Sequence, residues 1–473
     1  MRITAKGAAR KNSQETSRAA GARHGISGTS RLCLRFAEAV LVLSLLAFAV
    51  TTSPFAWMLG ASDRLDESPE MAIDGGPSRE RFVSTRPWSA SKAVIEERPT
   101  VFLQRSKSPI LDQGGPLGLS SNIKVYIYDL PSSYNTDWLV DSRCSSHLFA
   151  AEVAIHQNLL RSPVRTLDPD EADFFFMPVY VSCNFTSRSG FPTLFHASDI
   201  LQAAVGLVSR NMPFWDRHQG RDHVFVATHD FGACFHAMED LAVAMGIPQF
   251  LRNSIILQTF GEKNKHPCQN VDHIQIPPYV VPAKKLPDPR GQRRKILAFF
   301  RGKMEIHPKN VSGHMYSRGV RTTIWRRFSH DRRFFIKRKR SDNYKAEMLR
   351  SVFCLCPLGW APWSPRIVES VIQGCIPVII ADNIQLPYSH VIDWRKISVT
   401  VAERDVHKLD RILSKVAATN VSMIQANLWR DEVRQALVYN QPLVRGDATW
   451  QVLDLLSKRK NKVAEAGSRI KVA

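Results

Sequence analysis

One stretch in the second half of the chain carries residues suited to binding a phosphorylated ligand. Arg366 and Glu369 follow a loop rich in Gly, Pro and Trp, and they share one face of a helix expected over Pro365–Gln373. The amino terminus of a helix exposes free N–H groups that suit a pyrophosphate, Arg366 would add positive charge, and Glu369 could accept hydrogen bonds from a ribose. An ordinary surface ion pair would have the same spacing. The spacing by itself therefore leaves both interpretations open.

Two other apolar runs end in polar side chains. Arg301 and Lys303 flank a glycine after one run, which suits phosphate groups, although basic residues are common at strand ends. His229 and Asp230 follow another run, where they could deprotonate an acceptor hydroxyl or be a neutral structural histidine and a turn aspartate. The candidate nucleotide-binding residues are therefore Arg301, Lys303, Arg366 and Glu369. The candidate catalytic residues are His229 and Asp230.

No metal site is expected. Asp168-Pro-Asp170 is an Asp-x-Asp pair of the kind that can hold Mg²⁺ or Mn²⁺, but the proline between the carboxylates is typical of a turn. Cys354 and Cys356 have the wrong spacing for zinc and lie in an apolar run, where a buried cysteine is the usual finding. We therefore expect chemistry without a metal cofactor, in which basic side chains replace the ion.

The elements that position these residues alternate between strands and helices, twice over. Residues 277–292 contain five prolines, which would interrupt any regular element, and they separate the two alternations. Strands are expected near residues 123–128, 173–180, 223–227, 295–300, 352–356 and 376–381. Helices are expected near residues 147–160, 199–209, 234–245, 320–328 and 365–373. This pattern predicts two doubly wound α/β domains with a ligand cleft between them, at the carboxyl ends of the strands.

The amino-terminal part of the chain predicts a membrane anchor. Residues 1–35 hold eight basic side chains and one acidic one, within a formal net charge of +21, and residues 39–61 then run without a charge. Such an apolar run can cross a bilayer as a helix, and the basic flank before it predicts a cytoplasmic amino terminus. A cleaved signal peptide and an organelle transit peptide are the alternatives. Residues 62–120, with Ser, Pro, Gly and mixed charge, predict a stem.

Other features of the sequence agree with a lumenal body. N-glycosylation sequons begin at Asn184, Asn310 and Asn420, all beyond the apolar run. Of eight cysteines seven lie beyond it, and an odd number leaves at least one thiol without an intramolecular partner. A strongly basic chain often binds nucleic acid, but a lumenal body would not meet it. We therefore expect a membrane glycoprotein with no nucleic-acid partner.

Several segments, in chain order, resemble the exostosin-type glycosyltransferase family 47. They are Lys124–Pro131, Glu171–Phe176, Gly220–Phe225, His229–His236, Phe299–Gly302, Pro365–Glu369 and Gly374–Val378. The resemblance extends over about residues 121–455 and is nearest to the plant glucuronoxylan-synthesis branch, the fragile-fiber and irregular-xylem proteins. It implies a GT-B fold, in which two Rossmann-like domains face a cleft, with a UDP-sugar donor and Golgi residence. It also implies that Glu369 binds the ribose of the donor, and Ala361 stands where retaining enzymes often carry a second glutamate, in keeping with inversion.

The resemblance implies an inverting glycosyltransferase of cell-wall biogenesis, which moves xylose or glucuronic acid from a UDP-sugar to a xylan or glucuronoxylan chain or primer. A non-catalytic scaffold subunit of a xylan synthase complex, or transfer to another polysaccharide, are the alternatives. The expected partners are the donor, the polysaccharide, the Golgi membrane and other synthase subunits. The expected organisation of this single-pass type II Golgi protein is a cytoplasmic tail 1–38, an anchor 39–61, a lumenal stem 62–120, an acceptor-side domain 121–285, a nucleotide-sugar-binding domain 286–455 and a basic tail 456–473.

A dense basic run occupies residues 326–340, with eight Lys or Arg side chains and one acidic one. It could be a solvated loop and strand edge, or a docking surface for an acidic polymer or an acidic partner protein. Phe328, Phe334 and Phe335 lie within it and could either stack on sugars or face the core.

Overall fold

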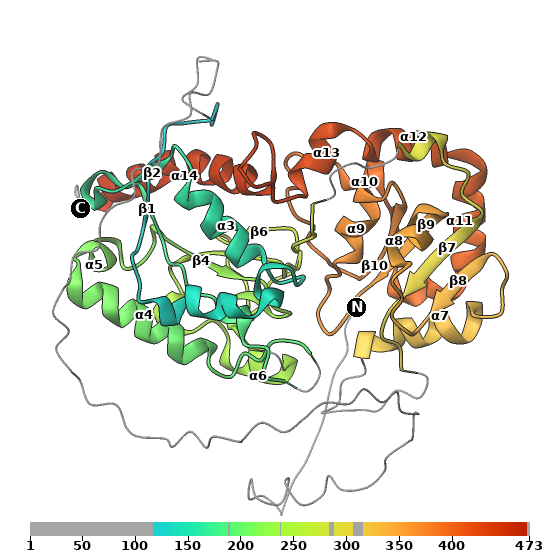
Figure 1. Cartoon of the computed structure of the whole chain (residues 1–473), viewed down its shortest axis with the longest axis horizontal. Coiled ribbons are helices and arrows are strands. Elements are labelled where there is room, and N and C mark those ends of the chain that lie inside the picture. Colours follow the sequence, from blue (N-terminus) through green and yellow to red (C-terminus); the bar gives the residue numbers. More distant parts are fainter. Residues whose placement is uncertain (1–116, 188–189, 237, 283–287, 306–315, 471–473) are drawn as a thin grey trace, which may run out of the picture. The chain divides into compact units, whose positions relative to one another are not determined.

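The structure is a computed structural model, and it describes residues 117–187, 190–236, 238–282, 288–305 and 316–470, without the side chains of 461–470 (Figure 1). These residues belong to one compact unit. The predicted tail, the anchor and nearly all of the predicted stem lie outside them. Within the described part of the chain, no helix is both long and apolar enough to span a membrane.

A parallel six-stranded sheet forms the amino-terminal half. The strands, in chain order, are β1 (Val125–Ile127), β2 (Arg165–Thr166), β3 (Phe174–Phe176), β4 (His223–Ala227), β5 (Ile255–Gln258) and β6 (Ile274–Gln275). Their order across the sheet is β2-β1-β3-β4-β5-β6, with parallel pairing throughout. The direction of winding reverses between β1 and β3, which is the topological switch point of a doubly wound sheet.

Helices cover both faces of this sheet because successive strand residues point to opposite sides. Phe174 and Phe176 belong to a buried cluster that includes side chains of α3, whereas Phe175 belongs to a second cluster formed with α4 and α5. The helices of this half are α3 (Ala151–Leu160), α4 (Ala197–Asn211), α5 (Phe214–His218) and α6 (Glu239–Met245). The half is therefore a three-layer α/β domain.

A parallel five-stranded sheet forms the carboxyl-terminal half, in the order β11-β10-β9-β7-β8. Its strands are β7 (Ile296–Arg301), β8 (Phe334–Lys337), β9 (Ser351–Pro357), β10 (Ile376–Ile380) and β11 (Val399–Thr400). Its helices are α7 (Val320–Phe328), α8 (Tyr344–Leu349), α9 (Arg366–Ile372), α10 (Trp394–Ile397), α11 (Leu409–Thr419), α12 (Val421–Leu428) and α13 (Asp431–Ala436). Both sheets thus have a switch point, and the predicted pair of doubly wound α/β domains is confirmed.

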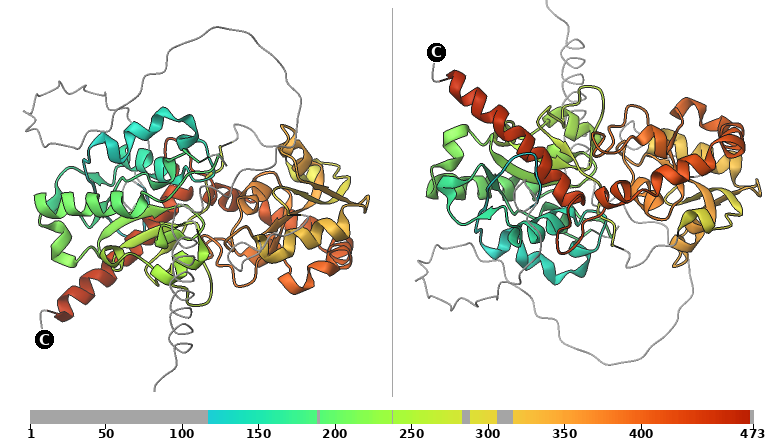
Figure 2. Two further views of the ribbon diagram at one scale, coloured as in Figure 1. Left: turned by 90° about the horizontal axis from the view of Figure 1, so that it is seen from below. Right: turned by 90° about the horizontal axis from the view of Figure 1, so that it is seen from above.

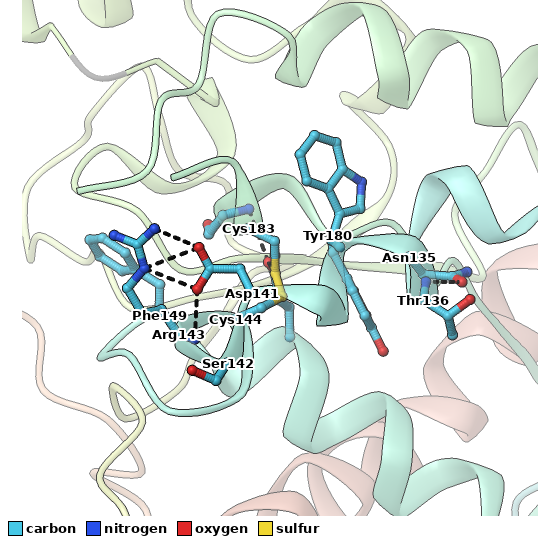
Figure 3. Close-up of a disulfide and its surroundings, with 12 residues drawn as sticks. Asn135, Thr136, Asp141, Ser142, Arg143, Cys144, Phe149, Tyr180 and Cys183 are labelled. Carbon is cyan, nitrogen blue, oxygen red and sulfur yellow. Dashed lines mark hydrogen bonds and ion pairs between the residues drawn. A yellow bond between two sulfur atoms is a disulfide. The ribbon is translucent and has the colours of Figure 1, made fainter. Parts of the chain in front are cut away.

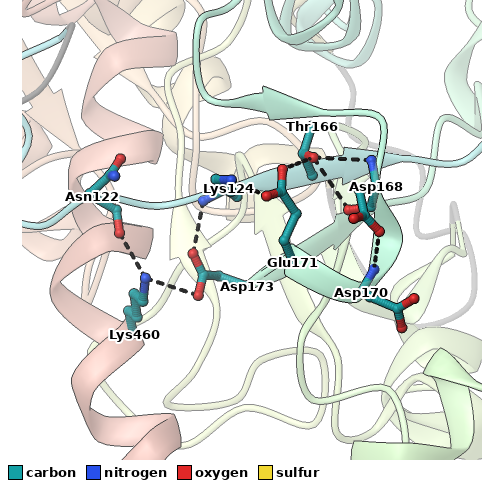
Figure 4. Close-up of polar contacts among 8 residues, drawn as sticks. All are labelled: Asn122, Lys124, Thr166, Asp168, Asp170, Glu171, Asp173 and Lys460. Carbon is teal, nitrogen blue, oxygen red and sulfur yellow. Dashed lines mark hydrogen bonds and ion pairs between the residues drawn. The ribbon is translucent and has the colours of Figure 1, made fainter.

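The last helix, α14 (Ala448–Ile470), lies against the amino-terminal half (Figure 2). Nδ2 of Asn158, on α3, donates to the Thr449 hydroxyl at 2.8 Å, and the Lys460 ammonium lies 3.0 Å from the Asp173 carboxylate (Figure 4). Helix α14 runs through positions 455 and 456, where the sequence suggested a boundary between a domain and a basic tail. Those residues form one helix that ties the end of the chain to the first sheet.

Most of the expected elements are present, and two of them, β4 and α7, cover the expected residues. The sequence analysis did not assign β5, a fully buried strand between β4 and β6, the edge strand β8, or the two-residue edge strands β2, β6 and β11. Pairings of two residues leave no periodic pattern in a sequence, because an alternation needs about four residues to be visible.

Candidate active site

The candidate nucleotide-binding residues of the carboxyl-terminal half lie near the carboxyl ends of β7 and β9. The winding of the five-stranded sheet reverses between these two strands, which are direct neighbours. Arg301 is the last residue of β7, and the loop after β9 leads into α9, which carries Arg366 and Glu369. Helix α9 ends within one residue of the expected Gln373, and Gly374 follows it with a φ of 65°, the left-handed conformation that commonly ends a helix. Open α/β sheets bind their ligands at such a switch point, outside the carboxyl ends of the strands.

The Arg301 guanidinium is already engaged by a carboxylate. Its Nε donates to Oε2 of Glu347 at 2.7 Å and its Nη2 donates to Oε1 at 2.5 Å, while Nη1 donates to the carbonyl of Lys339. The side chains of Arg301 and Glu347 are 11% and 12% exposed, so the pair is largely withdrawn from water. This two-point contact joins the end of β7 to α8, and it favours a structural role over direct contact with a phosphate.

Arg366 lies against the backbone at the end of β7. Its Nε and Nη2 donate to the carbonyl oxygen of Arg301 at 3.1 and 2.8 Å, and its guanidinium lies over the Phe300 ring. A side chain at Gly302 would overlap with Nη2 of Arg366, so the glycine is required for this approach. Burial by itself would lower the pKa of Arg366, but the neighbouring tyrosine and carboxylate groups raise it, and the guanidinium stays charged.

The Glu369 carboxylate is held by a tyrosine of α8. The Tyr344 hydroxyl donates to Oε2 of Glu369 at 2.6 Å. Burial and the nearby Glu369 carboxylate raise the pKa of Tyr344 well above its ordinary value, so the phenol stays protonated and acts as the donor. The ion pair with Arg366 that the spacing also allowed is absent between these two described side chains. Glu369 is half-buried, which suits a group that meets a ligand at the edge of the sheet.

Lys303 extends its ammonium group over two aromatic rings. Its Nζ lies 4.5 Å from the centre of the Tyr316 ring and 5.3 Å from that of Trp360, and 3.8 Å from a carboxylate oxygen of Glu305. The side chain is 57% exposed, so this cation can reach a ligand in solution. The interaction of a cation with such an aromatic ring contributes about 0.5–1 kcal/mol of binding free energy at exposed sites.

Asp230 joins the two halves of the described chain. Its Oδ1 accepts a hydrogen bond of 2.9 Å from Nε1 of Trp363, which lies in the loop between β9 and α9. Trp363 belongs to a buried cluster with Phe149 and Phe231 of the first half. The contact brings the end of β4, where the sequence placed catalytic residues, to the loop that leads to the nucleotide candidates.

His229 is buried beside Asp230, with 7% of its surface exposed. Its ring lies 4.7 Å from that of Phe149, and its Nδ1 is buried without a hydrogen-bond partner among the described residues. Burial lowers the pKa of His229, and the Asp230 charge opposes this only in part. The imidazole is therefore neutral near pH 7, the form that can accept a proton.

The sequence analysis missed five side chains of this region: His147, Tyr316, Tyr344, Glu347 and Trp363. His147 approaches the same Phe149 ring at 5.1 Å, and burial together with nearby positive charge lowers its pKa to about 4. Trp363 lay within the motif used to find the site, so its indole N–H was a usable signal. Tyr316 and Tyr344 lie in segments whose partners are distant in sequence, and no local pattern marks them.

Further contacts join the halves at one edge. The backbone N–H of Lys263 donates to the carbonyl of Asn383 at 2.7 Å, and Glu262 and Ile384 form an isolated antiparallel bridge. Burial raises the pKa of Glu262, although the Arg318 guanidinium lies 3.9 Å away and lowers it in part. These contacts hold the first sheet beside the second.

The basic run of residues 326–340 includes the edge strand β8 and the segment after it. Phe328 and Phe334 are buried and their rings stack at 4.6 Å, so both face the core rather than a sugar. Lys337 pairs in register with Arg301 of β7, and the exposed side chains of residues 337–340 therefore begin at the carboxyl edge of the sheet.

Three disulfides lie among the described residues: Cys144–Cys183, Cys234–Cys268 and Cys354–Cys375. The first holds the segment before α3 against the turn that follows β3, at Val181–Cys183, beside Tyr180 (Figure 3). The remaining described cysteine, Cys356, is a buried thiol, as the odd number of cysteines required. Cys354 is buried as expected but is bonded to Cys375, because parallel β9 and β10 bring the two residues to one face of the sheet.

The Asp-x-Asp pair forms a turn, as its proline indicated. Oδ1 of Asp168 accepts from the backbone N–H of Asp170, and Glu171 pairs with Lys124, which precedes β1 (Figure 4). The turn therefore lies toward the amino end of β1, the opposite edge from the candidate site. Among the described residues no group of three or more His, Cys, Asp or Glu could hold a metal ion.

The sequons differ in their surroundings. Asn420 is exposed where α11 meets α12, whereas Asn184 is half-buried and its amide lies 3.4 Å from Nδ1 of His196. Asn310 lies outside the described residues.

Comparison with known proteins places the chain in a family. The model of the exostosin GT47 domain matches residues 119–416, more than half of the chain. One probable glucuronoxylan glucuronosyltransferase of Arabidopsis thaliana is 58% identical over 359 residues, which are 75% of this chain and 76% of that protein. A second protein of the same plant, probable glucuronoxylan glucuronosyltransferase IRX7, is 59% identical over 392 residues, 79% of this chain and 88% of that protein.

A relative with another named activity also matches. Probable beta-1,4-xylosyltransferase IRX10 of Arabidopsis thaliana is 42% identical over 375 residues, 79% of this chain and 89% of that protein. The family model covers more than half of the chain, and the relatives are 42–59% identical over most of its length. The chain therefore belongs to the exostosin GT47 family and is a glycosyltransferase.

Proposed function

We propose that this chain transfers a sugar from a UDP-sugar to a xylan-type polysaccharide, with inversion at the anomeric carbon. The observation that carries the proposal is the convergence of Lys303, Arg366 and Glu369 at the switch point of the second sheet. The relatives are named for glucuronosyl and for xylosyl transfer, so glucuronic acid and xylose are the two candidate sugars. The two α/β domains would then act as those of a GT-B enzyme.

In this proposal, different residues of the carboxyl-terminal half bind different parts of the UDP-sugar donor. Glu369 accepts hydrogen bonds from the ribose hydroxyls, and the cations of Arg366 and Lys303 lie toward the diphosphate. Negative charge grows on the departing diphosphate in the transition state, and fixed cations stabilise that charge without reorganisation. Arg301 supports Arg366 through its carbonyl oxygen while its own guanidinium stays with Glu347. Since side chains supply the positive charge, we propose that no metal ion is required.

His229 is the base that we propose for the acceptor. In a single in-line displacement the acceptor oxygen attacks the anomeric carbon, the bond from that carbon to the diphosphate oxygen breaks, and the hydroxyl proton passes to the imidazole. Burial keeps His229 neutral and so able to take the proton. Asp230, whose carboxylate accepts from Trp363, would hold the loop after β9 at the first half and keep donor and acceptor groups together.

We further propose that the catalytic domain lies in the Golgi lumen, behind an anchor at residues 39–61. Three disulfides are typical of a protein that folds in an oxidising compartment. Protease added outside sealed Golgi vesicles should leave the carboxyl terminus intact until detergent is present. Digestion without detergent would refute this topology.

The activity is tested with the full-length protein purified in detergent. UDP-xylose and UDP-glucuronic acid are offered with xylo-oligosaccharides, and the anomeric configuration of the product is read by NMR. Glu369→Ala and His229→Ala are expected to lose transfer, the first with weakened UDP binding and the second without it. UDP binding with no transfer to any acceptor would favour the scaffold function, and a product with retained configuration would contradict the single displacement.

A further inference from the structure

The contact between Tyr344 and Glu369 has features of a built support rather than of an incidental neighbour. The phenol ring is partly buried, it lies 5.7 Å from the ring of Phe299, and its hydroxyl is 2.6 Å from Oε2 of Glu369. Among the described residues, this hydroxyl is the only group that donates a hydrogen bond to the Glu369 carboxylate. The oxygen Oε1 is therefore left for another donor.

The same helix supports a second member of the site. Tyr344 and Glu347 are three residues apart in α8 and so share one face of the helix. Glu347 holds Arg301, whose carbonyl oxygen in turn accepts from Arg366. One face of α8 thus fixes two of the predicted nucleotide-binding side chains, from the side of the sheet that carries Phe299 and the Cys354–Cys375 disulfide.

Tyr344 also keeps Glu369 from pairing with Arg366 on the same helix. Arg366 and Glu369 are one turn apart, and opposite charges at this spacing pair readily on a helix. Such an ion pair would occupy the Glu369 carboxylate and the Arg366 guanidinium, the two groups that are proposed to bind the nucleotide. In the structure Glu369 is bound by Tyr344 instead, and Arg366 donates to the backbone.

We propose that Tyr344 is the positioning residue of the nucleotide site, which holds Oε2 of Glu369 so that Oε1 can accept from a ribose hydroxyl. The proposal rests on the proposed function, since it assumes that a ribonucleotide is the ligand. A carboxylate fixed before binding loses less freedom when the ligand arrives, and the affinity rises accordingly. Tyr344 itself does not touch the ligand.

Tyr344→Phe removes one oxygen and keeps the ring against Phe299, and Tyr126→Phe, on β1 of the other half, removes one hydroxyl as a control. The Kd values of UDP and of 2′-deoxy-UDP are measured by calorimetry on the full-length protein. A hydrogen bond to a charged group predicts that the wild type binds UDP about tenfold or more tightly than the deoxy form. We expect this ratio to fall by at least half in Tyr344→Phe and to persist in Tyr126→Phe. The donor KM should rise in Tyr344→Phe while kcat is unchanged.

Glu369→Asp approaches the same contact from the other side, since it withdraws the carboxylate from Tyr344 and leaves the tyrosine in place. It is expected to lower the ratio in the same way, which keeps the test decisive if Tyr344→Phe does not fold. An unchanged ratio in folded Tyr344→Phe would overturn the positioning role while leaving UDP binding, and the proposed function, intact. An unchanged ratio in folded Glu369→Asp would overturn the positioning role and would also remove Glu369 from the ribose. A wild-type protein that does not bind UDP would remove the proposed function and this inference together.

Discussion

Glu347→Gln separates two roles that Arg301 could have, as a ligand of the diphosphate or as a support of the sheet. The substitution leaves the Arg301 charge in place and removes the charge that balances it. The pair has two hydrogen bonds, of 2.7 and 2.5 Å, and both side chains are nearly nine-tenths buried. Removing one partner of a buried pair typically costs 3–5 kcal/mol. Since Arg301 keeps its bond to the Lys339 carbonyl, we expect about 3 kcal/mol, the lower end.

The assay is urea unfolding followed by tryptophan fluorescence, with UDP affinity measured in parallel. Asp288→Asn is the matched control, because the Asp288–Arg290 pair has the same two-point geometry but exposed side chains, and water screens the attraction in an exposed pair. The double variant Arg301→Met, Glu347→Leu should regain most of the stability lost in Glu347→Gln, since well-packed apolar side chains often replace a buried pair without loss.

The double variant also decides the role of Arg301. If Arg301 is a support, UDP binds the folded double variant within about threefold of the wild type, which is under 1 kcal/mol. A tenfold or greater loss of UDP affinity in a double variant of normal stability would show that Arg301 contacts the diphosphate. Equal unfolding curves for Glu347→Gln and the wild type would refute the structural account of the pair.

Four further outcomes are expected. Glu369→Ala should weaken UDP binding by about 1.5–3 kcal/mol, measured by calorimetry, without a comparable loss of stability; unchanged affinity would exclude the ribose role. Transfer should survive EDTA, and a complete loss that Mn²⁺ restores would contradict metal-free catalysis. Because burial lowers the pKa of His229, the proton-accepting form persists below pH 6.5, so the acid limb of kcat should lie under that value, and a limb above it would point to another base. Neutralising residues 337–340 should weaken salt-sensitive binding of glucuronoxylan while sparing UDP; equal, salt-independent binding of neutral xylan would leave only a solvated edge.

The sequence by itself determined the two α/β domains and the candidate residues at the strand ends. Strand and helix runs alternate on either side of the proline-rich segment, and a parallel sheet places all its carboxyl ends at one edge. This is why Arg301 and Arg366, far apart in the chain, could be assigned to one site before any contact was known. The glycine at position 302 was assigned to phosphate groups from the sequence, and in the structure its missing side chain leaves room for the Arg366 guanidinium.

The tertiary structure decided what each of these side chains is bonded to. Arg301 was assigned to a phosphate from its charge, but the partner that balances it, Glu347, comes from a helix after the next strand. The hydroxyl that holds Glu369 and the indole that holds Asp230 are supplied by segments with no spacing relation to them. Local periodicity records which face of an element is buried, whereas side-chain pairing depends on how separate elements are packed together. For that reason the placement of the candidate residues at the carboxyl edge of the sheet was predictable from the sequence, whereas the partner that each side chain binds was not.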